Sequence, residues 1–94
     1  KKSIEGAMGI YRWALKNDQT YRSQILIRQQ IGFCHERLDQ IPAARDSYDQ
    51  IVKLCEMHPV DVRNNPAVRV TRDLTKFRLR NLNHQIKQQK NTQP

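Results

Sequence analysis

One stretch of this chain, residues 28–52 (RQQIGFCHERLDQIPAARDSYDQIV), constrains its fold more than any other. Apolar residues recur there at spacings of three and four, a pattern typical of two amphipathic helices. Residues 39–42 (DQIP) separate them, because proline ends one helix and suits the first turn of the next. Each segment carries a small residue, Gly32 or Ala44, in its middle. Helices approach within about 8–10 Å only where the contacting residues are small, so we expect these two helices to pack closely.

The same helical spacing extends over the rest of the 94 residues, whereas alternating patterns are short and give little indication of strands. We therefore expect an all-α fold in one domain, residues 4–88, followed by a frayed tail at residues 89–94. Residues 58–66 (HPVDVRNNP) hold a proline near each end, which favours a loop. The predicted helices cover residues 4–16, 21–38, 42–57 and 67–88.

The two central helices resemble a tetratricopeptide repeat. That family repeats about every 34 residues with a pattern close to W-x₂-L-G-x₂-Y, then A-x₃-F, then P. Ile31 and Gly32 stand at its Leu-Gly position. Ala44, followed four residues later by Tyr48, stands at its A-x₃-F position. The first predicted helix resembles the second helix of a preceding repeat, and the residues that carry this match are Ala7, Tyr11, Ala14 and Leu15.

The resemblance covers residues 4–59 and departs from the family at Arg28, where the family prefers Trp, and at His35, where it prefers Tyr. It implies a stack of antiparallel helix hairpins with the last helix as a cap. Such an array is short, since about three repeats are normally needed for stability. We therefore expect either self-association through the first helix or origin in a longer array. The small residues expected at the helix contacts are Ala7, Ala14, Gly32 and Ala44.

The resemblance also implies a function, namely non-catalytic protein–protein interaction or scaffolding. In this family the first helix of each hairpin lines a concave groove, which would bind a peptide or helical segment of a partner or mediate assembly. Phe33 favours an apolar or helical partner segment, although the same side chain would also suit packing against a neighbouring helix. The groove positions carried over to this chain are Leu26, Gln29, Gln30, Phe33 and Glu36.

The distribution of charge indicates an alternative function. The formal net charge is +8, and residues 59–94 hold eight basic and two acidic side chains. A basic helix face predicts binding of an anion, nucleic acid or acidic surface, with an affinity that falls as salt rises. The other interpretation of this basic face is the solvated outer face of a capping helix. Nucleic acid is the less favoured ligand, because only Phe77 on this helix could stack on bases. The predicted basic face consists of Arg69, Arg72, Lys76, Arg80 and Lys87.

The chain contains no catalytic motif, glycine-rich phosphate loop or Cys-x-x-Cys pair, so we expect no enzymatic activity, no cofactor and no metal. His35 and Asp39 have the spacing of a metal pair, but an ordinary histidine at the edge of the core is the favoured interpretation. No apolar run approaches the roughly 20 residues needed to cross a membrane. Cys34 and Cys55 lie among apolar residues, which favours buried thiols over a disulfide and leans towards a reducing compartment such as the cytoplasm.

Overall fold

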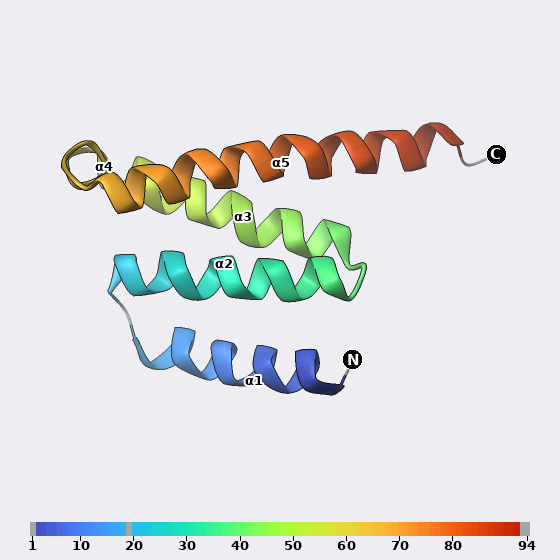
Figure 1. Cartoon of the computed structure of the whole chain (residues 1–94), viewed down its shortest axis with the longest axis horizontal. Coiled ribbons are helices and arrows are strands. Elements are labelled where there is room, and N and C mark those ends of the chain that lie inside the picture. Colours follow the sequence, from blue (N-terminus) through green and yellow to red (C-terminus); the bar gives the residue numbers. More distant parts are fainter. Residues whose placement is uncertain (1, 19, 93–94) are drawn as a thin grey trace.

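The structure is a computed structural model that describes residues 2–18 and 20–92, and these residues form five helices and no strand. Figure 1 shows the long helices running in alternating directions, each beside the previous one in the chain. The expected all-α stack of antiparallel helices is therefore confirmed. The helices are α1 (Lys2–Asn17), α2 (Tyr21–Arg37), α3 (Ile41–Glu56), α4 (Pro59–Asn64) and α5 (Pro66–Thr92).

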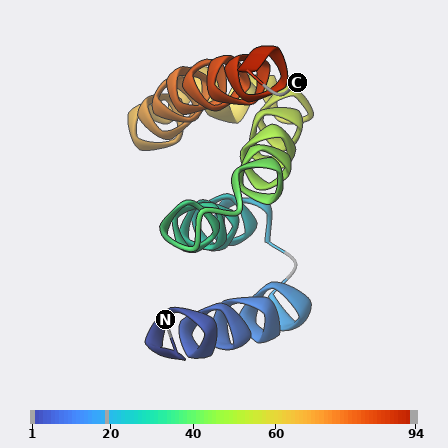
Figure 2. The same cartoon turned by 90° about the vertical axis from the view of Figure 1, so that its right-hand side faces the viewer.

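Each long helix packs mainly on the next long helix along the chain. α1 packs on α2, α2 on α3, and α3 on α5, with the short α4 at the last turn. The turned view in Figure 2 shows α3 offset to one side, so that α2 and α5 share the opposite side of the stack.

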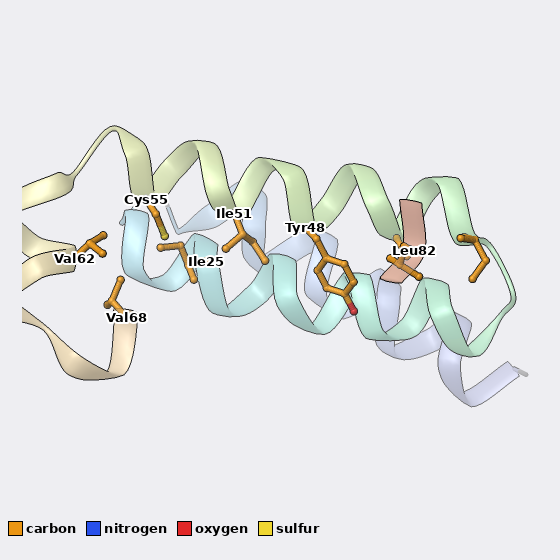
Figure 3. Close-up of a cluster of buried hydrophobic side chains, with 9 residues drawn as sticks. Ile25, Tyr48, Ile51, Cys55, Val62, Val68 and Leu82 are labelled. Atoms are coloured by element: carbon orange, nitrogen blue, oxygen red, sulfur yellow. The ribbon is translucent and has the colours of Figure 1, made fainter. Parts of the chain in front are cut away.

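The core is a strip along α3, where this helix meets α2 and α5. In Figure 3, Tyr48, Ile51 and Cys55 project from α3 towards α2, and Ile25 of α2 lies near Ile51 and Cys55. Tyr48 and Ile51 are completely buried. The apolar face of α3 therefore holds its neighbours together by burial of hydrocarbon and aromatic surface. The other buried members of the cluster are Ile41, Ala44, Val62, Val68 and Leu82.

α2 and α3 approach closely at Gly32, which lies against the ring of Tyr48. A Cβ atom at Gly32 would stand 2.3 Å from Cε1 of that ring, far inside van der Waals contact. Ala44 is completely buried in the core cluster. Ala7 and Ala14 are half-buried on α1, and Ala7 lines a cavity between α1 and α2. The missing side chain at Gly32 is what allows the Tyr48 ring to enter the interface.

Two segments differ from the sequence prediction. Residues 58–66 contain helix α4 rather than a loop, because Pro59 and Pro66 each stand at the start of a helix. Proline suits that position, where its missing N–H leaves no intrahelical hydrogen bond unmade. The predicted frayed tail is helical through Thr92, since no proline or glycine interrupts α5 after its first residue. Residues 93–94 of that tail lie outside the described residues.

The turn after α2 contains a residue in the left-handed region, Asp39, with a φ of 57°. Its N–H donates to the carbonyl of Glu36 at 3.0 Å, and the N–H of Gln40 donates to the carbonyl of His35 at 2.8 Å. These two bonds define a Schellman motif, whose left-handed position usually holds glycine. Nδ1 of His35 and Oε1 of Gln40 lie 2.7 Å apart and link the side chains across the turn.

We expect Gly32→Ala to lower the free energy of unfolding by about 1–3 kcal/mol, because the new methyl group overlaps the Tyr48 ring. Gly6→Ala is the matched control, since nothing lies within 4 Å of a Cβ atom built at this helical position. Helix propensity should make the control more stable by up to about 1 kcal/mol. Urea denaturation followed by circular dichroism measures both variants. Effects of the same sign would contradict the close approach of Gly32 to Tyr48.

Asp39→Gly should raise the free energy of unfolding by about 0.5 kcal/mol. A Cβ atom costs roughly 1–2 kcal/mol in the left-handed region, and the greater freedom of glycine in the unfolded chain offsets roughly half of that gain. The melting temperature should rise by about 2–4 °C. Asp39→Ala is the control, because it keeps the Cβ atom and loses the polar side chain that tolerates this conformation. If alanine stabilises the protein as much as glycine, Asp39 is not strained.

Candidate functional site

α2 faces α4 and α5 across a groove that two ion pairs span. Arg22 of α2 pairs with Asp61 of α4 at one end. Glu36 of α2 pairs with Arg78 of α5 towards the other end, with 2.9 Å between Oε2 and Nη1. A cavity of about 170 Å³ adjoins Arg22, and one of about 390 Å³ adjoins Arg78. The groove therefore offers two pockets, one beside each ion pair.

Large apolar side chains remain exposed along this groove. Leu26 of α2 is 57% exposed and lines the smaller cavity. Leu74 and Phe77 of α5 are 54% and 55% exposed and line the larger one. Burying a side chain of this size contributes about 1.5–3 kcal/mol. A ligand that covers these three side chains would therefore gain a substantial part of its binding free energy from them.

Arg78 joins the groove to the core. Its guanidinium carbon lies 4.5 Å from the centroid of the Phe33 ring, within range of a cation–π interaction. The oxygen of Glu36 that accepts from Arg78 also accepts from the hydroxyl of Tyr48. Burial, together with the hydrogen bond to Glu36, raises the pKa of Tyr48 far above its usual value, so its hydroxyl remains a donor. This network fixes α2, α3 and α5 relative to one another.

The structure distributes the predicted groove residues over two sides of α2. Leu26 and Glu36 line the two cavities towards α5. Gln30 and Phe33 line a third cavity, of about 190 Å³, between α1 and α2, although the Phe33 ring also contacts Arg78 of α5. Gln29 is half-buried and lines none of these three cavities. The groove residues of α5 that sequence reasoning missed, because it treated this helix as a cap, are Leu74, Phe77 and Arg78.

The predicted basic face of α5 is divided along the helix. Arg80 and Lys87 lie towards its second half, and the guanidinium carbon of Arg80 is 6.0 Å from the centroid of the Phe77 ring. The other three predicted cations line a cleft between α3, α4 and α5, where Arg63 of α4 joins them. Sequence reasoning missed Arg63 because it assigned this residue to a loop. The cations of the cleft are Arg63, Arg69, Arg72 and Lys76.

The outer face of α1 is another exposed apolar surface. Ile10 is 68% exposed and Trp13 is 67% exposed. Gly6 and Gly9 lie on the same side of the helix, with nothing within 4 Å of a Cβ atom built at either position. This is the helix through which the sequence predicts self-association, and that association stays a prediction.

The histidine and cysteine side chains are groups that could in principle bind a metal or react; among them, His58 packs on an aromatic ring and both cysteines are buried. Among residues 2–18 and 20–92, no three or more His, Cys, Asp or Glu side chains are grouped so that they could hold a metal ion. His58 stacks on Tyr21, with the ring centroids 3.8 Å apart. Cys34 and Cys55 are buried free thiols. None of the described helices has both the length and the apolar character needed to span a membrane. The expected lack of catalytic activity stays a prediction.

Comparison with protein-family models, curated proteins and solved structures found no match to this chain. The resemblance to the tetratricopeptide family therefore depends on the residues that carry it, such as Gly32, Ala44 and Tyr48, and stays a prediction. The groove, the basic cleft and the outer face of α1 are the features of the molecule from which a function can be inferred.

A double-mutant cycle of Glu36→Gln and Arg78→Met should give a coupling free energy of about 0.5–1 kcal/mol, because this ion pair is only partly exposed. The glutamine retains an acceptor for Tyr48, so the cycle isolates the pairing with Arg78. Arg45→Met and Asp46→Asn form the control cycle, since that pair lies between adjacent residues on the surface of α3. Chemical denaturation measures both cycles. A coupling near zero for the first pair would show that it does not hold the groove together.

Proposed function

We propose that this chain is a non-catalytic protein-interaction module of tetratricopeptide type, and that the groove between α2 and α5 binds an acidic, amphipathic segment of a partner protein. The observation that carries the proposal is the exposure of Leu26, Leu74 and Phe77 around two pockets of one groove. Isolated apolar side chains are common on protein surfaces, but apolar side chains that flank a concave surface are typical of peptide-binding sites.

The order and packing of the helices support the tetratricopeptide type. Antiparallel helices stack in chain order, and α2 and α5 share one side of the stack (Figure 2). Gly32 and Ala44, which stand at the small-residue positions of the family pattern, are both buried. In a helix-hairpin array, the shared side is the concave one that binds extended or helical ligands.

The charge of the chain supports an acidic partner. The net charge of +8 favours association with negatively charged segments through long-range attraction. Arg78 supplies a local contact, because its side chain is 46% exposed while its guanidinium pairs with Glu36. A partner carboxylate can therefore join or replace Glu36 at Arg78, while apolar partner side chains cover Leu74 and Phe77. Such a ligand would contact both the cationic and the apolar side chains of this groove.

The extent of the exposed surface also favours an interaction module. The accessible surface is 6516 Å², whereas a compact folded protein of 11.1 kDa exposes about 5,700 Å². The additional accessible surface is expected for a stack of helices, because each long helix packs mainly on the next long helix and its lateral faces remain exposed. A partner segment along α2 and α5 would cover part of this surface.

Peptides selected from a random library on the immobilised wild-type chain test the proposal. We expect the selected peptides to combine acidic with large apolar residues. Leu26→Ser or Leu74→Ser should weaken their binding about tenfold, because each change removes apolar surface worth roughly 1.4 kcal/mol. Fluorescence anisotropy with one labelled peptide measures the affinities.

Val60→Ser is the matched control, because Val60 is 62% exposed on α4 and lines neither pocket of the groove. It should leave the affinity of the peptide unchanged within about twofold. If Val60→Ser weakens binding as much as Leu74→Ser, the peptides do not occupy the groove. If the groove variants bind as tightly as wild type, the proposed function is wrong.

A further inference from the structure

The cleft between α3, α4 and α5 lies apart from the groove and has a volume of about 500 Å³. One wall consists of side chains from the end of α3 and from α4, mainly apolar, and includes the buried Cys55. Four cations from α4 and α5 also line the cleft, against one carboxylate, that of Glu56. The volume lies within the range of about 300–1,000 Å³ that is usual for small-molecule sites. The cleft therefore combines ligand-sized space with an excess of positive charge.

Within residues 2–18 and 20–92, three of these cations have no neutralising partner. Among the residues that the structure describes, no carboxylate oxygen lies within 4.0 Å of a charged nitrogen of Arg63, Arg69 or Lys76. Nη1 of Arg69 donates to the backbone carbonyl of Arg63 at 2.6 Å, which anchors its guanidinium beside α4. Arg72 pairs with Asp73, its neighbour in the chain, at 3.1 Å. The positive charge of the cleft is thus available to a ligand.

The field of these cations reaches the interior of the cleft. Cys55, which is 3% exposed, lines the cleft from α3. Its burial raises the pKa of the thiol, whereas the charges of Arg72 and Lys76 act to lower it and that of Glu56 acts to raise it. Two of the cations, Arg72 and Lys76, therefore act on a buried thiol that lines the cleft.

We infer that this cleft binds a compact, phosphate-bearing anion, of which pyrophosphate is the simplest form. Guanidinium groups present paired donors that match phosphate oxygens, and several cations around one space favour a multiply charged ligand. The apolar wall of α3 and α4 can accommodate an organic group attached to the phosphates, as in a nucleotide. This inference is independent of peptide binding in the groove, because no cleft residue lines either groove pocket.

The geometry favours a compact anion over a nucleic acid strand. A strand that followed the basic face of α5 would contact Arg80 and Lys87 as well, but these residues do not line the cleft. Phe77, the aromatic residue of α5, lines the groove on another side of the helix, where it cannot stack on bases held in the cleft. The cations that converge belong to two helices and enclose one space. A strand would need a linear track of cations instead.

Pyrophosphate titrated into the ¹⁵N-labelled full chain at low salt tests the inference. We expect chemical-shift changes that saturate and that concentrate in residues 52–76, which include the cleft lining. Arg69→Gln combined with Lys76→Gln should weaken binding about tenfold or more, since each removes a charge-assisted contact. Lys2→Gln combined with Arg12→Gln is the matched control, because it lowers the net charge equally on the remote helix α1 and should change the affinity less than twofold.

Two further measurements separate the cleft from other sources of anion binding. Arg80→Gln combined with Lys87→Gln should retain binding of pyrophosphate, and a short oligothymidylate should bind more weakly than pyrophosphate at equal phosphate concentration. Equal losses in the Arg80/Lys87 and Arg69/Lys76 variants, or tighter binding of the oligothymidylate, would show that the stripe of α5 binds a strand and would overturn the inference. Absence of saturable shifts with millimolar pyrophosphate would overturn it as well.

Discussion

The contact between Gly32 and the ring of Tyr48 is the constraint on which the other features of the molecule depend. Because Gly32 has no side chain, the ring enters the space between α2 and α3 and its hydroxyl reaches Glu36. Glu36 in turn holds Arg78 of α5, whose guanidinium covers the ring of Phe33. A single small residue thus sets the distance between two helices and, through three side chains, the position of a third.

The two proposed sites share α5 but use different sides of it. Leu74 and Arg78 face the groove with α2, while Arg69 and Lys76 line the cleft with α3 and α4. Both sites lie between helices that the core holds rigidly, so their shapes depend on the burial of Val68 and Leu82 of α5. A ligand at either site would stabilise the docking of α5 on the rest of the stack.

The α2–α3 pair could be predicted from sequence because its signals are local. Spacing of apolar residues, Gly32, Ala44 and the proline after the turn all lie within one short stretch. These signals predict the fold class, but they do not predict helix α4. The sequence pattern indicates a break at Pro59, whereas in the structure Pro59 is the first residue of α4. Whether a proline ends one helix or begins the next depends on residues further away in the chain than its immediate neighbours.

The candidate sites were harder to predict because each one combines residues from distant segments. Three of the cations around the cleft were identified from their spacing on one helix, but Arg63 joins them only through the turn between α4 and α5. In the groove, Leu26 and Glu36 were identified from one helix, while the facing Leu74 and Arg78 were not. Periodicity describes one face of one helix, and the pairing of faces depends on how the helices pack. The main interhelical contacts join α1 with α2, α2 with α3, and α3 with α5 across the short α4. Little chain must therefore be closed into loops before these contacts form, and helical proteins rich in such local contacts fold within microseconds to milliseconds.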